Sequence, residues 1–150
     1  MSGHYRNQKR DFKHQKTKSP TEVAQTYLED ISLLLDLENS TTTQIKQGVS
    51  RVEKLIQENK DVKAHQVRNV FNLVKDTNDL KRLNLLRPKL AYIGARQVSR
   101  HGQVIVKLMD LLIQEITSKP QGEQVQLLGG LKYISESLVA YHKFYSNEKD

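Results

Sequence analysis

Apolar side chains return every three or four residues along most of the chain, a spacing that places them on one face of a helix. Two of these stretches open on a start signal. Ser19 precedes Pro20 and stands three residues before Glu22. Thr41 stands three residues before Gln44. Both arrangements are capping boxes, so the pattern predicts helices that begin at these positions. Their apolar faces are Val23, Tyr27, Ile31, Leu34 and Leu35 in the first, and Ile45, Val49, Val52 and Ile56 in the second.

The middle of the chain predicts a third helix from about residue 62 to residue 76, followed by two further elements. The inward side chains of this helix are Val67, Val70, Phe71 and Val74. Residues 77–86 are predicted as a short helix or turn that Pro88 ends, since the residue before a proline avoids helical geometry. Pro88 then starts a helix that reaches about His101, and Gly102 breaks the chain.

Two long apolar stretches complete the pattern. Residues 104–118 are apolar on nearly all sides, which is typical of a helix in the middle of a bundle or beneath a partner subunit. After a break at 119–122, a last helix carries Val125, Leu128, Leu131, Ile134, Leu138, Tyr141 and Tyr145. Gly129 and Gly130 within it indicate close packing or a kink. No stretch alternates as a strand does, so the predicted fold is all-α, a single compact bundle of five to six helices.

The first residues of the chain predict no core. Residues 1–18 contain no Val, Leu or Ile and hold six Lys or Arg. Such a segment cannot bury enough apolar surface to offset the entropy of ordering it. We therefore predict a disordered basic arm over 1–18, a helical bundle domain over 19–146 and a tail over 147–150. The arm either contacts RNA or DNA without sequence preference or serves as a solubilising extension.

Composition and charge limit the kinds of site, compartment and partner that this bundle can have. The 150 residues include no Cys, which excludes disulfides and thiolate metal sites. No apolar run is long enough to span a membrane and no secretory signal is present, so we expect a cytoplasmic protein without a membrane partner. The net charge is +7, and residues 41–109 hold fourteen bases against five acids, whereas residues 21–40 hold five acids and no base. This segregation favours a nucleic-acid face, the alternative being a solvated basic surface.

Two stripes of polar side chains fit an anionic strand. The first, on the predicted 62–76 helix, spans about 80° and consists of His65, Arg68, Asn72 and Lys75. The second, on the predicted 88–101 helix, spans about 40° and consists of Lys89, Arg96 and Arg100. The few aromatic residues fall mostly at core spacing, which disfavours base stacking. The predicted contact is therefore with the nucleic-acid backbone, independent of sequence and sensitive to salt.

Catalytic chemistry is poorly represented in the sequence. The chain has no glycine-rich phosphate loop, no His-Glu-x-x-His metal motif and no cysteine nucleophile. Arg96 and His101 match the loose spacing of helical ribonucleases, but a chain of this composition yields about 0.8 such matches by chance. His65 lacks the small neighbours of a phosphotransfer histidine. We therefore expect no enzyme activity, no metal and no cofactor.

Three stretches together resemble a known family. They are residues 67–74 (VRNVFNLV), 86–96 (LRPKLAYIGAR) and 139–145 (VAYHKFY). In combination they resemble the small subunit of type III-A CRISPR effector complexes, the Csm small subunit, over residues 20–146. The resemblance implies a non-catalytic helical bundle in antiviral defence, whose copies stack head to tail and face the duplex of guide RNA and target RNA. It also implies contacts with the backbone subunits, which cut the target, and with the large subunit, which carries the signalling chemistry.

The resemblance also implies individual RNA contacts. The first two motifs, carried over residue by residue, give Arg68, Asn72, Arg87, Lys89 and Arg96. Helical positions add Arg51, Lys63, Lys75 and Arg100 as candidates. Tyr92 and Tyr141 are predicted as core or interface anchors instead of ligand contacts. A stand-alone helical nucleic-acid-binding regulator and a small nuclease are the competing functions, and the sequence leaves both open.

Overall fold

The computed structural model describes residues 18–96 and 99–146. Within these ranges the chain forms six α-helices and one short 3-10 helix, with no strand. They are α2 (Pro20–Ile31), η1 (Ser32–Leu34), α3 (Thr42–Glu58), α4 (Ala64–Lys75), α5 (Leu80–Ala95), α6 (Arg100–Thr117) and α7 (Gln121–Ser146). The predicted all-α class and helix number are confirmed. The predicted tail, and all of the predicted arm except Lys18, lie outside the described residues.

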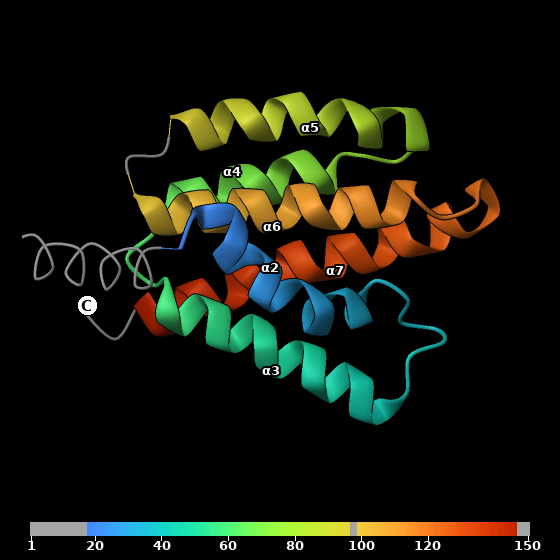
Figure 1. Cartoon of the computed structure of the whole chain (residues 1–150), viewed down its shortest axis with the longest axis horizontal. Helices are drawn as coiled ribbons and strands as arrows, with labels where there is room; N and C mark the ends of the chain where they lie inside the picture. The colour runs from blue at the N-terminus through green and yellow to red at the C-terminus, as the bar shows by residue number, and fades with distance from the viewer. Residues whose placement is uncertain (1–17, 97–98, 147–150) are drawn as a thin grey trace, which may run out of the picture.

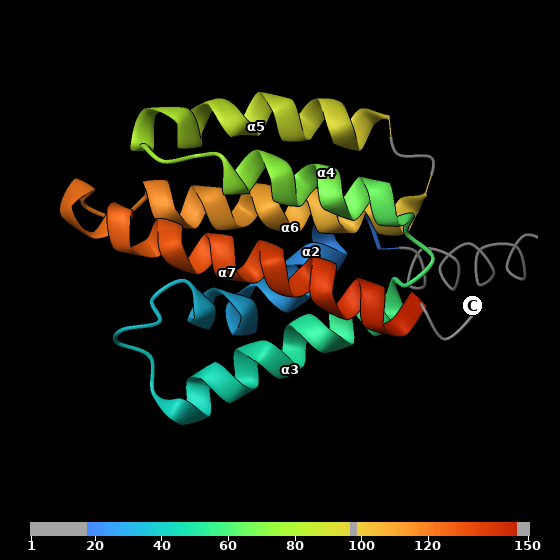
Figure 2. The ribbon, with the colours of Figure 1, turned by 180° about the vertical axis from the view of Figure 1, so that it is seen from behind.

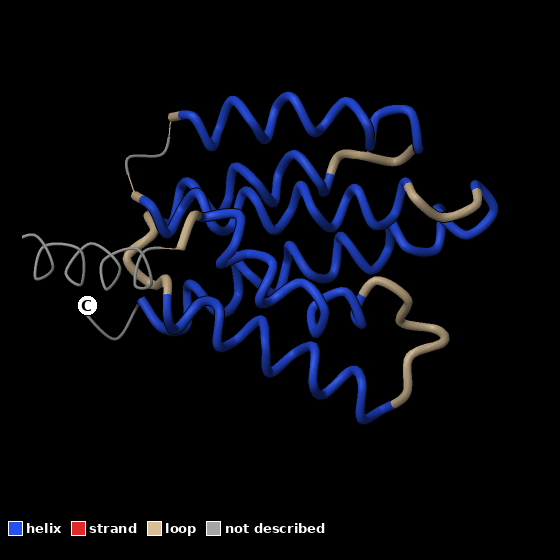
Figure 3. The backbone as a smooth tube through the Cα atoms, viewed as in Figure 1, coloured by secondary structure: helices blue, strands red, loops and turns tan. Residues whose placement is uncertain are grey.

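The helices are arranged in two layers between two edge helices (Figures 1 and 2). α2 and α6 form one layer, α4 and α7 form the other, and α5 and α3 run along opposite edges. The connections lie at the ends of the bundle, as the tan segments of Figure 3 show. α5 is therefore separated from α3 by the rest of the molecule.

The two predicted capping boxes start α2 and α3. The Glu22 amide donates to Ser19 Oγ at 3.1 Å, and the Ser19 amide donates to the Glu22 carboxylate at 3.3 Å. Reciprocal hydrogen bonds of 3.1 and 2.9 Å join Thr41 and Gln44 in the same way. Each cap involves only neighbouring residues, and for this reason the sequence located both helix starts.

α6 is the centre of the core, as its apolar sequence predicted. It packs against α2, α5, α7 and α4. Its buried residues are Gly102, Val104, Ile105, Val106, Leu108, Met109, Leu112, Ile113 and Ile116. One hydrophobic cluster joins them to buried residues of the other five helices. In the described part of the chain, no helix combines the length and the apolar character needed to cross a membrane.

α5 corrects the prediction for residues 77–101. A single helix runs through Leu80–Ala95 with Pro88 inside it, so Pro88 does not start a helix. The start signal is Asp79, whose carboxylate accepts a hydrogen bond from the Arg82 amide at 2.8 Å. Proline removes one backbone hydrogen bond, but Pro88 is exposed, where water can satisfy the carbonyl group left free. Three buried leucines hold both halves of the helix on the core: Leu83, Leu86 and Leu90.

Gly102 does not break the chain, contrary to the prediction. It lies in the first turn of α6, which begins at Arg100. The N-cap is Ser99, whose hydroxyl accepts hydrogen bonds from the amides of His101 and Gly102. Gly102 is buried, and it lines a small space between α4 and α6 together with Val67 of α4.

Val125 is 66% exposed, although its spacing predicts the apolar face of α7. Gln124 takes the inward position at this end of the helix. Its side-chain amide donates to the Lys119 carbonyl oxygen at 2.7 Å, which satisfies a backbone group between α6 and α7. A polar contact between two helix ends therefore sets the first turn of α7, and hydrophobic spacing alone does not reveal it.

Close approach between elements explains two glycines. A Cβ on Gly130 would lie 2.1 Å from the carbonyl oxygen of Leu35, so α7 touches the backbone that follows η1. A Cβ on Gly48 would lie 2.6 Å from Cγ of Leu34. A Cβ on Gly129 would meet no atom within 4 Å. The close packing predicted for the glycine pair in α7 is confirmed, and it depends on Gly130.

Candidate nucleic-acid interface

The outer side of α4 presents the first predicted stripe. Val67, Val70 and Val74 are buried, so residues on the opposite side of this helix face solvent. These exposed residues are His65, Arg68, Asn72 and Lys75. The ammonium group of Lys75 lies 6.0 Å from the centre of the Phe71 ring. Lys63, the N-cap residue of α4, is exposed as well.

The second predicted stripe is wrong as a single helical stripe. Lys89 lies within α5 and Arg96 is the C-cap residue of that helix, and both are exposed. Arg100 is the first residue of α6 and is also exposed. Because the chain ends one helix at Ala95 and starts the next at Arg100, the spacing that joined the three residues does not apply.

α4 and α5 are neighbouring helices that both carry exposed cations. The two helices lie side by side (Figures 1 and 2), and on each of them the exposed residues lie opposite the buried ones, so together they offer a basic surface. We call this surface the α4–α5 face and define it as Arg68, Asn72, Lys75, Lys89 and Arg96. Within residues 18–96 and 99–146, none of its four cations forms an ion pair. The α4–α5 face therefore keeps a net positive charge.

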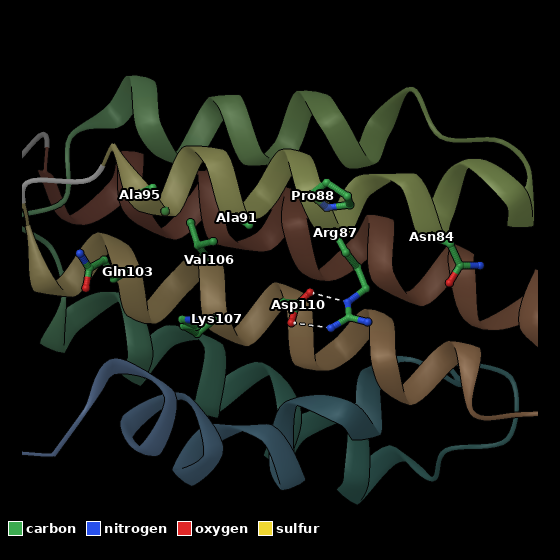
Figure 4. Close-up of a pocket in the computed structure, with 10 residues that line it drawn as sticks. Asn84, Arg87, Pro88, Ala91, Ala95, Gln103, Val106, Lys107 and Asp110 are labelled. Carbon is green, nitrogen blue, oxygen red and sulfur yellow. Dashed lines mark hydrogen bonds and ion pairs between the residues drawn. The ribbon is translucent and has the colours of Figure 1, made fainter.

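Arg87 points elsewhere, towards the groove between α5 and α6 (Figure 4). Its Nε lies 2.7 Å and its Nη2 lies 3.4 Å from the two carboxylate oxygens of Asp110. The hydrogen bond to Asp110, together with the attraction of that carboxylate, raises the pKa of the guanidinium. The groove has a volume of about 720 Å³ and its lining includes Ala91 and Val106. Arg87 thus links two helices by an ion pair, in contrast to the unpaired cations of the α4–α5 face.

Arg51 lies on α3, across the bundle from the α4–α5 face. Its side chain is 24% exposed and its Nε lies 3.5 Å from the Asp30 carboxylate. Nη2 donates to the Thr26 carbonyl oxygen at 3.0 Å, and the guanidinium lies 4.3 Å from the centre of the Tyr27 ring. Burial first, and then a hydrogen bond with Glu58, raise the pKa of Tyr27 to about 12. The structure therefore separates Arg51 from the other candidates and fixes it between α2 and α3.

We expect Arg51→Ala to weaken the fold and to leave RNA affinity unchanged. The substitution removes the ion pair with Asp30 and the cation–π contact with Tyr27, a loss of about 1–2 kcal/mol in unfolding free energy. Urea denaturation and RNA titration measure the two effects. Lys54→Ala, at an exposed position of the same helix, is the control and should change stability by less than about 0.5 kcal/mol. A marked loss of RNA affinity in Arg51→Ala at unchanged stability would contradict this assignment.

Tyr92 is not buried, so the first of its two predicted roles, that of a core anchor, is wrong. It is 64% exposed and lies on α5 opposite the buried Leu86 and Leu90. Arg96 Nη1 donates to Tyr92 Oη at 3.3 Å, and the guanidinium carbon lies 5.5 Å from the ring centre. A prediction of one continuous helix through Pro88 would have placed this ring on the exposed side, because it lies opposite the buried leucines. Tyr141 is partly buried and packs against the core cluster.

The pair proposed for nuclease chemistry is divided between two helices. Arg96 follows α5, whereas His101 lies in the first turn of α6. His101 Nδ1 lies 2.5 Å from the Asp61 carboxylate, so this histidine has an acidic partner. Across the described ranges, no group of three or more His, Cys, Asp or Glu residues is placed to hold a metal ion. Among the described residues, the feature that remains for a ligand is the set of unpaired cations on the α4–α5 face.

The comparison with known proteins identifies a family. A family model described as Csm2 Type III-A matches residues 15–148 of this chain. The matched range contains every helix described above and all nine predicted RNA-contact residues. No curated protein and no solved structure matches the chain.

Proposed function

Because this chain belongs to the Csm2 Type III-A family and is a subunit of the Csm complex, we propose that it binds the guide–target RNA duplex through the α4–α5 face. In this proposal the chain has no catalytic site and helps to scaffold the filament of subunits in antiviral defence. Its protein partners are the backbone and large subunits of the complex and further copies of itself. The compartment is the cytoplasm.

The observation that carries this proposal is the set of four exposed cations on the α4–α5 face, which lack acid partners in the described structure. RNA phosphates attract such cations, and the release of counterions favours the contact. With 12 and 16 residues, α4 and α5 are about 18 and 24 Å long at 1.5 Å per residue. A surface of this length spans several phosphates of one strand.

The chemistry of the face fits a contact that does not depend on sequence. Pairing between guide and target carries the sequence information, so a subunit needs only to follow the shape and charge of the duplex. An RNA duplex presents phosphates and 2′-hydroxyl groups at its surface. Arg68 and Lys89 suit the phosphates, and the amide of Asn72 can both donate to a phosphate and accept from a hydroxyl.

The four remaining RNA-contact candidates differ in whether they form an ion pair. Lys63 and Arg100 start α4 and α6, are exposed and have no ion pair within the described residues, so we place them at the margin of the RNA contact. Arg51 and Arg87 each bind a carboxylate of a neighbouring helix. We assign these two residues to holding the helices in place, which supports the α4–α5 face indirectly.

We expect the double charge reversal Arg68→Glu and Lys89→Glu to weaken RNA binding about tenfold or more at moderate salt, whatever the RNA sequence. The plot of log affinity against log salt should become shallower by about 0.7 to 0.9 for each lost phosphate contact. Fluorescence anisotropy of labelled RNA at several salt concentrations measures both effects. The recovered RNA should be intact with and without EDTA, as a non-catalytic subunit requires.

The matched control is Lys46→Glu, which reverses an exposed lysine on α3, across the bundle. It should leave both affinity and salt slope unchanged. Circular dichroism should show all variants folded, because exposed substitutions change stability by about 0.5 kcal/mol or less. Equal RNA affinity for the double variant and the unaltered chain would remove the α4–α5 face from the RNA contact.

A further inference from the structure

Tyr92 stands at the edge of the α4–α5 face with most of its ring uncovered. Its exposed fraction is 64% even though the guanidinium of Arg96 lies over the ring. The hydrogen bond from Arg96 Nη1 to Tyr92 Oη, at 3.3 Å, ties the two side chains together. The ring and the guanidinium are thus next to each other before any ligand binds.

This arrangement differs from that of the other exposed apolar side chains. Those are Leu37, Leu85, Val125, Tyr133 and Phe144. Phe144 is as exposed as Tyr92, at 65%, but contacts the ring of Tyr145 edge-on. Of the exposed aromatic rings in the described structure, Tyr92 alone has a cation over it. Among the described residues, an open aromatic face and a guanidinium therefore occur together at this one exposed position.

We propose that Tyr92 and Arg96 form a stacking platform for an unpaired RNA base, an inference that rests on the proposed RNA-binding function and specifies one of its contacts. Aromatic rings and guanidinium planes are the groups on which proteins stack unpaired bases. Bases inside a continuous duplex have no free face, so the platform acts only where a base is unpaired or turned out of the stack. It adds a stacking contact to the phosphate contacts made by neighbouring cations.

The charge around the platform favours nucleic acid as its ligand. Lys89 lies one helical turn before Tyr92, and Arg96 lies one turn after it. Residues 80–96 include no acid. An RNA strand drawn to these cations brings a base with each phosphate, and the exposed ring lies between the two charges. The alternative is that a protein partner contacts this ring, and the experiment distinguishes the two ligands.

The test compares two RNAs and three variants of the full chain. One RNA is a fully paired duplex, and the other is the same duplex with unpaired 2-aminopurine nucleotides in one strand. Tyr92→Leu keeps an apolar side chain but removes the π face, Tyr92→Phe keeps the ring, and Phe144→Leu removes an equally exposed ring from α7. Anisotropy gives affinity, and the quenching of 2-aminopurine fluorescence reports stacking.

We expect Tyr92→Leu to bind the RNA with unpaired bases about five- to tenfold more weakly and to lose the quenching. It should bind the paired duplex within about twofold of the unaltered chain, because the phosphate contacts persist. Tyr92→Phe should retain quenching and affinity within about twofold. Phe144→Leu should resemble the unaltered chain with both RNAs.

Two results would overturn the platform. The first is unchanged quenching and affinity in Tyr92→Leu while the Arg68→Glu and Lys89→Glu variant still binds both RNAs weakly, which would leave the proposed function intact. The second is an equal loss with both RNAs together with a smaller mass in light scattering, which would make Tyr92 a contact between protein subunits. If the charge-reversed variant binds like the unaltered chain, the proposed function itself fails, and this outcome is distinct from both.

Discussion

Gly130→Ala is expected to lower the unfolding free energy by about 2–4 kcal/mol, because the added methyl group has no space. Its Cβ would lie 2.1 Å from the carbonyl oxygen of Leu35 and 2.5 Å from that of Leu34. Both atoms belong to the backbone, so no change of rotamer can relieve the overlap. Relief requires that α7 move away from η1. Urea denaturation followed by circular dichroism measures the loss.

The neighbouring glycine provides the control. A Cβ on Gly129 would meet no atom within 4 Å, and alanine is favoured over glycine inside a helix by up to about 1 kcal/mol. Gly129→Ala should therefore raise the unfolding free energy, whereas Gly130→Ala lowers it. Effects of the same sign at both positions would show that α7 does not approach η1 as the structure has it.

Leu112→Ala is expected to cost about 2–5 kcal/mol of unfolding free energy. Leu112 is fully buried in α6, the helix that packs against four others, so truncation leaves a cavity that the packed neighbours cannot fill by small movements. Differential scanning calorimetry should show a large fall in Tm together with a fall in unfolding enthalpy.

The matched substitution is Leu85→Ala on α5. The same side chain is removed there, but Leu85 is 61% exposed, so we expect a stability change of about 0.5 kcal/mol or less. Because both variants lose the same side-chain atoms, the difference between their unfolding free energies reports the effect of burial. Similar losses at the two positions would mean that the exposed side of α5 is covered by another copy of the chain in solution.

The sequence predicted those parts of the fold that depend on residues close together in the chain. Ser19 with Glu22 and Thr41 with Gln44 satisfy their own helix starts, so the capping boxes needed no knowledge of the tertiary structure. The stretch in α6 is apolar on nearly all sides, so it had to lie at the centre of the bundle, because an outer position would expose part of it to water. Local chemistry and hydrophobic periodicity were sufficient here.

The same reasoning failed where packing overrides a local preference. Pro88 disfavours the helical geometry of Arg87, but three buried leucines and the ion pair of Arg87 with Asp110 hold the helix on the core. Asp79 and Ser99 are the N-cap residues of α5 and α6. The sequence-based prediction missed both because it took Pro88 as a helix start and Gly102 as a break. Stronger use of N-cap residues would have placed both helix starts correctly.

The sequence predicted which residue types form the candidate site, but not which of the basic residues are paired with acids. Arg51 and Arg87 have carboxylate partners 21 and 23 residues away in the chain, and no local pattern identifies such pairs. Arg68, Asn72, Lys75 and Lys89 lie on exposed sides of α4 and α5 because buried valines and leucines occupy the opposite sides. The core role predicted for Tyr92 was wrong because the prediction divided α5 into two elements.

Pro88 has a consequence for how the molecule adapts to an uneven surface. α5 lies at the edge of the fold, lacks one internal hydrogen bond near its midpoint, and is held by three buried leucines and by the ion pair of Arg87 with Asp110. Sub-global opening that detaches this helix alone costs less than unfolding the bundle around α6. We therefore expect α5, the edge helix that carries Lys89, Tyr92 and Arg96, to open more readily than α6, so that it can adjust to an irregular ligand surface.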